Sequence, residues 1–192
     1  IEINYGNNKK VFFKGKIDRI DRHNEDIIVI DYKTGNVKDD IKNELYYGAK
    51  IQLFVYLSAI AKDNFKPVGM MYMLINDKFI KDDAKTYPFT GLILDSAAKD
   101  FDLTPNDGEL IDRKKSSVDE DLLRRLIAYA MDISSKACEE ISDGYIESKP
   151  DKDACSYCDY KDICRARLKE PLVRKLPSIR KFDFDLEDGK VD

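Results

Sequence analysis

The first third of the chain has the alternation of apolar runs and polar breaks that is typical of a β-hairpin. Residues 11–21 are rich in apolar and aromatic side chains, and the polar residues 22–26 that follow are typical of a turn. A second apolar run over residues 27–34 stops at Gly35. These segments predict two antiparallel strands that are joined by a loop of four residues.

Two longer segments have helical patterns. Residues 44–61 are apolar nearly all round, so this helix is expected to be buried, and residues 118–141 carry apolar side chains at helical spacing before Gly144. Between these helices, residues 67–75 and 87–94 predict further strands. We therefore expect an α/β fold, with a mixed central sheet flanked by helices and a cysteine-containing C-terminal extension.

The composition is that of a globular domain without a membrane span. The chain has 192 residues, 43% of them hydrophobic and 36% charged, which is enough to bury a sizeable core. Its longest apolar run, residues 68–75, is too short to cross a bilayer, and its first residues do not resemble a secretory leader. We therefore expect a cytoplasmic protein with no membrane partner.

The charge is unevenly distributed. A net charge of −4 argues against a protein that binds polyanions over its whole surface. Residues 161–181, however, carry eight lysine or arginine side chains against two acidic ones. This basic stretch either binds phosphates locally or forms a solvated tail, and the sequence leaves both interpretations open.

The hairpin brings three charged residues to one face of the sheet. Asp31 and Lys33 are two residues apart on one strand, so their side chains point to the same side. A loop at residues 22–25 or 23–26 places Asp18 opposite Val29 or Asp31, and both positions face that side. Asp18, Asp31 and Lys33 are therefore expected to converge.

Two carboxylates and a lysine on an apolar strand pair are costly to bury unless something compensates their charge. A hard divalent cation such as Mg²⁺ offers that compensation, because it prefers oxygen ligands and completes its shell with water and phosphate. Together with a neighbouring lysine, this is the layout of a metal-dependent phosphodiesterase. Gln52 and Tyr56 lie four residues apart on one face of the buried helix and could brace Lys33 or contact a DNA backbone.

Three of the four cysteines lie within ten residues, as Cys155-x2-Cys158-x5-Cys164. Without a secretory leader, this spacing favours metal or cluster ligation over disulfide bonds. A zinc site is an alternative, but it would be one ligand short unless Cys138 of the long helix joined it. A short helix or turn is expected after these cysteines, over residues 162–168.

Three segments of the chain resemble the motifs of the PD-(D/E)xK nuclease superfamily, and of its RecB-type branch in particular. They are residues 15–21, residues 30–35 with their Asp-Tyr-Lys-Thr-Gly run, and residues 52–56 with glutamine and tyrosine at the two ends. Residues 144–150 and the cysteines that follow are similar to the end of the nuclease domain in AddB-type subunits of bacterial helicase–nucleases. The resemblance covers residues 11–168.

The resemblance implies a restriction-endonuclease-like core over residues 1–150, an iron–sulfur-type segment over residues 151–169 and an extended basic or charged tail over residues 170–192. It implies that Asp18, Asp31 and the carbonyl of Tyr32 bind Mg²⁺ or Mn²⁺. Lys33 would be the catalytic lysine, with Gln52 and Tyr56 beside it in the catalytic site. Cys155, Cys158 and Cys164 would hold a 4Fe-4S cluster, complete only in the intact parent protein.

The function implied is that of a Mg²⁺-dependent DNA exonuclease domain in double-strand break repair and recombination, working with DNA and a helicase–nuclease partner subunit. Two features depart from the family pattern. No helix that could supply a histidine or an acidic residue to the metal precedes Asp18, and no cysteine precedes the core. Both suggest that Ile1 begins inside the natural domain. The alternative function is a catalytically inactive nuclease fold that serves as a DNA-binding or structural module.

Overall fold

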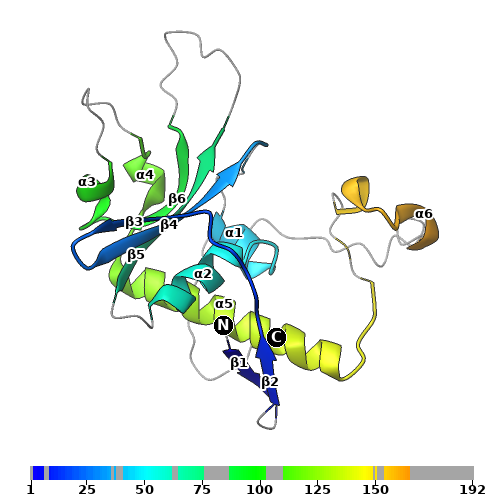
Figure 1. The fold of residues 1–192 in the computed structure, drawn as a ribbon. Helices are drawn as coiled ribbons and strands as arrows, with labels where there is room; N and C mark the ends of the chain where they lie inside the picture. Colours follow the sequence, from blue (N-terminus) through cyan, green and yellow to red (C-terminus); the bar gives the residue numbers. More distant parts are fainter. Residues whose placement is uncertain are drawn as a thin grey trace.

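In the computed structural model of the chain, five strands form a mixed central sheet (Figure 1). Its order is β3-β4-β5-β6-β7, with antiparallel pairing of β3 with β4 and β5 with β6, and parallel pairing of β4 with β5 and β6 with β7. The mixed sheet expected from the sequence is therefore confirmed. The strands are Arg19–His23 (β3), Asp26–Lys33 (β4), Lys66–Leu74 (β5), Phe89–Leu94 (β6) and Ser117–Val118 (β7).

The structure describes residues 2–6, 9–35, 37, 41–61, 65–75, 87–102, 110–148, 150 and 154–164. The tail expected over residues 170–192 and most of the basic stretch lie outside the described residues. The short helix expected over residues 162–168 is described only as α6, Lys161–Cys164.

The prediction of one strand over residues 11–21 is wrong. Strand β2, Lys9–Phe12, pairs with β1, Glu2–Tyr5, in a separate two-stranded sheet that contacts the long helix. The chain then crosses to the central sheet without regular structure until β3 begins. On the way, the main chain at Gly15 lies so close to Tyr56 that an added Cβ would be 2.6 Å from a ring carbon. This close approach requires glycine.

The β3–β4 hairpin confirms one of the two registers expected for Asp18. The turn has two residues instead of four, and Asn24 in it has a φ of 55°, which asparagine tolerates better than most residues. Arg19 pairs with Ile30 and His23 with Asp26, so continuing this register places Asp18 opposite Asp31. His23 ends β3 and is not part of the turn.

The single helix expected over residues 44–61 is two helices, α1 from Ile41 to Tyr46 and α2 from Gln52 to Ile60. The break is at Gly48, whose φ of 70° is open to glycine at little cost, and whose N–H donates to the carbonyl of Leu45 at 2.8 Å. Apolar periodicity alone did not indicate this break. Its consequence is that α2 begins at Gln52.

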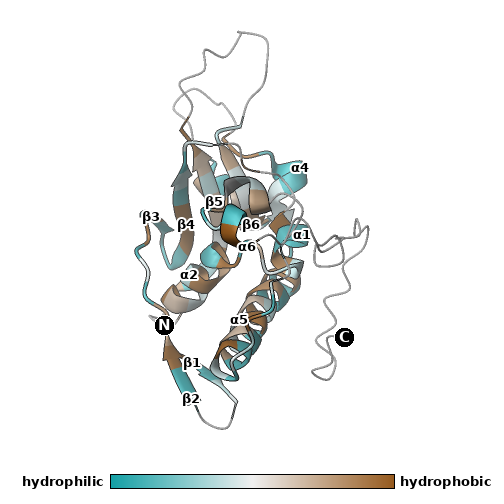
Figure 2. Cartoon of the chain, turned by 90° about the vertical axis from the view of Figure 1, so that its right-hand side faces the viewer, coloured by the Kyte–Doolittle hydropathy of each residue, from teal (hydrophilic) through white to brown (hydrophobic). Residues whose placement is uncertain are grey.

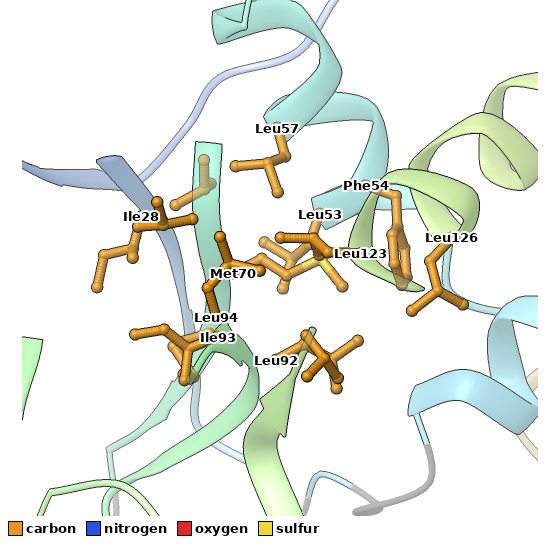
Figure 3. Packing of buried hydrophobic residues seen from close by; sticks show 14 of the residues in the cluster. Ile28, Leu53, Phe54, Leu57, Met70, Leu92, Ile93, Leu94, Leu123 and Leu126 are labelled. Atoms are coloured by element: carbon orange, nitrogen blue, oxygen red, sulfur yellow. The ribbon is translucent and has the colours of Figure 1, made fainter. Parts of the chain in front are cut away.

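The core lies where α2 and α5, Glu120–Ser142, pack against the sheet (Figure 3). Leu53 and Leu57 point toward Met70 of β5, and Phe54 points toward Leu126 of α5. The predicted burial of the segment that forms α2 is confirmed, and the long helix expected over residues 118–141 is present as α5, although Val118 lies in β7. Asp119 caps α5 by accepting a hydrogen bond from the N–H of Leu122 at 2.7 Å.

Apolar residues follow the inner strands and one side of α5, while the other side of that helix is polar (Figure 2). No helix among the described residues is long and apolar enough to span a membrane. The remaining short elements are α3 (Ala98–Phe101), α4 (Arg113–Ser116) and a 3-10 turn (Ala154–Tyr157).

Gly91→Ala tests the close packing of β5 against β6. A Cβ at this position would lie 2.1 Å from the carbonyl oxygen of Met70, so the two main chains must move apart. We expect a loss of about 1–3 kcal/mol of unfolding free energy and a fall in Tm of at least about 2 °C. The matched control is Gly35→Ala, where a Cβ meets nothing within 4 Å. Equal Tm values for the two variants would contradict the packing.

Candidate active site

The site is built around a carboxylate at the end of the most buried strand. The side chains from Ile27 to Ile30 are all buried, and Asp31 that follows them is only 5% exposed. Asp31 is paired across the parallel ladder with Tyr72 of β5. A buried carboxylate is costly unless it is hydrogen-bonded and paired, so the neighbouring groups determine what Asp31 can do.

Helix α2 supplies the first partner of this carboxylate. The amide nitrogen Nε2 of Gln52 donates to Oδ1 of Asp31 at 3.3 Å and lies 3.2 Å from the hydroxyl of Tyr56. Gln52 is the first residue of α2, and Tyr56 follows one turn later. The expected grouping of these two side chains beside the site is therefore present, but Gln52 braces Asp31 and not Lys33.

Lys33 supplies the second partner. Its Nζ lies 2.5 Å from Oδ2 of Asp31, and 39% of the lysine side chain is exposed against 8% of the aspartate side chain. Oδ2 makes no hydrogen bond of good geometry within the part of the chain that the structure describes. The ion pair with Lys33 therefore compensates the negative charge on Oδ2, and the Lys33 side chain has access to solvent.

Asp18 completes the group from the neighbouring strand. It lies just before β3, is exposed, and its Oδ2 accepts a hydrogen bond from the main-chain N–H of Tyr32 at 3.1 Å. Tyr32 lies between Asp31 and Lys33 in the chain, so this bond holds the two acidic residues at the same end of the hairpin. The convergence of Asp18, Asp31 and Lys33 on one end of the hairpin agrees with the sequence prediction.

Sequence reasoning missed Tyr72 and the ion pair beside it. Lys33 Nζ lies 5.4 Å and Lys50 Nζ 5.5 Å from the centre of the Tyr72 ring, which is within cation–π range. Lys50 Nζ also lies 2.5 Å from Oε2 of Glu44 in α1. These residues come from three separate elements, and only the parallel pairing of Asp31 with Tyr72 could have indicated their proximity.

The hydroxyl of Tyr72 is held in its neutral form. Burial raises its pKa to about 12, and the negative charges of Asp31 and Glu44 add to this effect. The tyrosine therefore remains a hydrogen-bond donor throughout the physiological pH range. It is a neutral wall of the site and not a base.

The donor set fits a hard divalent cation in its chemistry. Asp18 and Asp31 offer carboxylate oxygens, Tyr32 offers a main-chain carbonyl, and Oδ2 of Asp31 is buried without a hydrogen bond. Among the described residues, no group of three or more His, Cys, Asp or Glu side chains could hold a metal ion. A cation at this position would therefore also need oxygen ligands from water or from a substrate phosphate.

The three cysteines of the C-terminal segment are not gathered into a ligand group. Cys155 is buried, Cys158 is half-buried and Cys164 is exposed, with the Cys164 Sγ 3.7 Å from the hydroxyl of Ser148. An iron–sulfur cluster needs four protein ligands in most proteins. The described arrangement of these cysteines does not fit a bound cluster, and the iron–sulfur assignment stays a prediction.

Comparison with known proteins agrees with this geometry. The sequence model of the PD-(D/E)XK nuclease superfamily matches residues 1–165 of the chain. The recognition and the restriction-endonuclease-like fold inferred from the sequence are therefore confirmed.

Among curated proteins, the chain is similar to the B-type subunit of the ATP-dependent helicase/deoxyribonuclease of several bacteria. It is 33% identical over 208 residues to the protein of Clostridioides difficile (strain 630), covering 83% of this chain and 17% of the relative. It is 32% identical over 203 residues to that of Clostridium novyi (strain NT), covering 85% and 18%. For Clostridium perfringens (strain SM101 / Type A) the values are 28% over 232 residues, covering 99% and 19%. The chain thus spans about a fifth of the length of these relatives.

A double-mutant cycle tests whether Lys33 compensates the buried charge. In the absence of metal, we expect Lys33→Met to lower the unfolding free energy by about 1–3 kcal/mol, because it strands the Asp31 carboxylate. Combined with Asp31→Asn, the loss should be smaller than the sum by about 1 kcal/mol or more.

The matched control for this cycle is the exposed pair Lys136–Asp132 of α5, whose Nζ–Oδ2 distance is 2.9 Å and whose side chains are both 42% exposed. The cycle with Lys136→Met and Asp132→Asn should give a coupling of about 0.3–0.5 kcal/mol. Chemical denaturation measures both cycles. Equal couplings would show that Lys33 has no special role in holding Asp31.

Proposed function

Because the chain belongs to the PD-(D/E)XK nuclease superfamily, we propose that it is the metal-dependent deoxyribonuclease domain of a helicase–nuclease subunit. The observation that carries the proposal is the buried carboxylate of Asp31, held by Gln52 and Lys33 and joined by Asp18 through the main chain. The name that the relatives share, helicase/deoxyribonuclease, supports DNA as the substrate.

In this proposal Asp18, Asp31 and the carbonyl of Tyr32 would hold Mg²⁺ or Mn²⁺. The bound cation would supply a water of lowered pKa and neutralise charge on the scissile phosphate. Gln52 keeps the Asp31 carboxylate in place by its hydrogen bond to Oδ1. The ammonium of Lys33, which pairs with Oδ2 of Asp31 and has access to solvent, would donate a hydrogen bond to a phosphate oxygen or to the attacking water.

The reaction is hydrolysis of a phosphodiester bond. The water oxygen forms a bond to phosphorus while the bond from phosphorus to the leaving sugar oxygen breaks, and a proton is released.

We infer that the domain acts as an exonuclease in double-strand break repair and recombination in the bacterial cytoplasm. The helicase partner subunit and the ATP dependence would belong to the larger complex, because no Gly-x4-Gly-Lys-Ser/Thr loop occurs in this sequence.

A second candidate function is a DNA-binding module whose nuclease fold has lost its chemistry. The observation that favours it is the count of ligands, since only two carboxylates meet at the end of the hairpin among the described residues. The two candidates differ in whether the chain cleaves DNA and binds a divalent cation.

Cleavage of end-labelled DNA by the 192-residue chain in Mg²⁺ or Mn²⁺ tests the proposed activity. We expect Asp31→Asn and Lys33→Ala each to lower the cleavage rate by about 100-fold or more, because each removes a group that acts on the phosphate or its cation. Asp26→Asn, at the other end of β4, and Lys66→Ala, at the start of β5, are matched controls that should keep full activity.

Absence of cleavage by the unsubstituted chain would favour the inactive module. Cleavage that survives Asp31→Asn would contradict the assignment of the site. Gradual shortening of the labelled strand from one end, without internal cuts, is the product pattern expected of an exonuclease.

Metal binding can be measured without activity, from the thermal stability of the chain. A cation that binds only the folded state stabilises it by RT ln(1 + [L]/Kd), which is about 2.7 kcal/mol at 100 times Kd. We expect Mn²⁺ to raise Tm in the unsubstituted chain and in Asp26→Asn, and to have no effect in the double variant Asp18→Asn, Asp31→Asn. An equal rise of Tm in the double variant would place the cation elsewhere.

A further inference from the structure

A groove lies beside the candidate active site, between the segment that follows β2 and the outer side of α2. It has a volume of about 710 Å³, in the range of pockets that bind small ligands or single nucleotides. Its walls are largely apolar and include Phe13, Ile17, Val55, Tyr56 and Ala59. Neither the proposed metal site nor the hydrolysis step makes use of it.

The groove and the candidate active site share two residues. Gln52 and Tyr56 line it, and the same amide nitrogen of Gln52 that approaches the Tyr56 hydroxyl at 3.2 Å donates to Asp31 at 3.3 Å. A group that enters the groove therefore lies next to the carboxylate that anchors the site. A ligand with a phosphate at Asp31 would direct its adjoining part into this groove.

Strand β2 and the segment after it, which forms one wall of the groove from Phe13 onward, are basic and aromatic. Residues 9–16 read Lys-Lys-Val-Phe-Phe-Lys-Gly-Lys, with four lysines around two phenylalanines. Lys10 pairs with Glu2 at 2.8 Å, and Lys9 donates to Ser142 at 3.0 Å. Lys14 and Lys16 are exposed, and neither forms an ion pair with another described residue. Lysines interleaved with aromatic side chains are typical of surfaces that bind single nucleic-acid strands.

The main chain at Gly15 approaches α2 closely beside the groove. Gly15 packs directly against the Tyr56 ring, so the segment cannot move closer to α2 and its position relative to the helix is set. Phe13 and Lys14 are on the N-terminal side of this contact and both line the groove. An aromatic ring and a lysine thus line the same groove as Gln52.

We propose that this groove is a nucleobase-binding subsite. An unpaired base would lie against Phe13 and the apolar side of α2, its own phosphate would be near Lys14, and the adjoining scissile phosphate would be at Asp31 and Lys33. The inference rests on the proposed nuclease function, which it deepens by assigning a contact to the base. A paired base could not enter, because its faces and edges are covered within the duplex.

The test measures binding in EDTA, where no cleavage occurs. Fluorescence anisotropy gives the affinity of the chain for a short labelled oligothymidylate and for an oligomer of the same length with abasic sugars. We expect the bases to tighten binding, and Phe13→Ala to weaken binding of the oligothymidylate by about tenfold, since base–aromatic stacking contributes about 1–3 kcal/mol per base. Affinity for the abasic strand should not change.

Phe12→Ala is the matched control. Phe12 is the neighbouring phenylalanine in the chain, is 66% exposed and does not line the groove, so its loss should leave both affinities unchanged. Two further variants guard against a loss of folding in Phe13→Ala. Phe13→Leu keeps an apolar side chain without the aromatic face, and Ala59→Leu fills the groove without deleting a contact. Both should weaken base-dependent binding alone.

Three results would overturn the subsite. They are equal affinity for the two strands, an equal effect of Phe12→Ala and the Phe13 variants, and no binding of the oligothymidylate at all. The nuclease proposal is judged separately, from cleavage that Asp31→Asn abolishes. Base-dependent binding without cleavage would refute only the nuclease, and cleavage without base-dependent binding would refute only the subsite.

Discussion

The buried carboxylate of Asp31 is the constraint on which the rest of the site depends. A charged group that is 5% exposed at the end of an apolar strand must be compensated, and the groups around it come from different elements. Gln52 reaches it from α2, Lys33 from its own strand, and Tyr72 lies beside it on β5. The order of the strands and the start of α2 place these groups around Asp31.

The break between α1 and α2 is part of this arrangement. Had the helix run without interruption through residues 44–61, Gln52 would be an interior residue with its side chain set by the helix path. Because Gly48 ends α1, α2 begins anew at Gln52, and α1 is free to place Glu44 beside Lys50 and the Tyr72 ring. The break between the two helices thus places polar side chains at the site, while the apolar side of α2 still packs in the core.

Much of the fold and most of the site follow from local patterns. The parity of a hairpin with an even number of loop residues fixes Asp18, Asp31 and Lys33 on one face, and the apolar periodicity of α2 and α5 survives in the core. What could not be predicted depends on tertiary contacts. Strand β2 lies in a second sheet because β1 is available as a partner there, and Tyr72 meets Asp31 only because β4 and β5 pair in parallel.

The ion pair also relates the free site to the proposed loaded one. Lys33 and a divalent cation would compensate the same oxygen, Oδ2 of Asp31, so the two compete for it. Because Lys33 is the exposed member of the pair, its ammonium can leave the carboxylate when a cation takes that position, while Gln52 keeps its hold on Oδ1. The displaced ammonium remains close to the end of the hairpin, where a bound phosphate would bring negative charge. In the proposed mechanism, one lysine would compensate the carboxylate before the cation binds and the substrate afterwards, which agrees with its place at the solvent-exposed end of an otherwise buried strand.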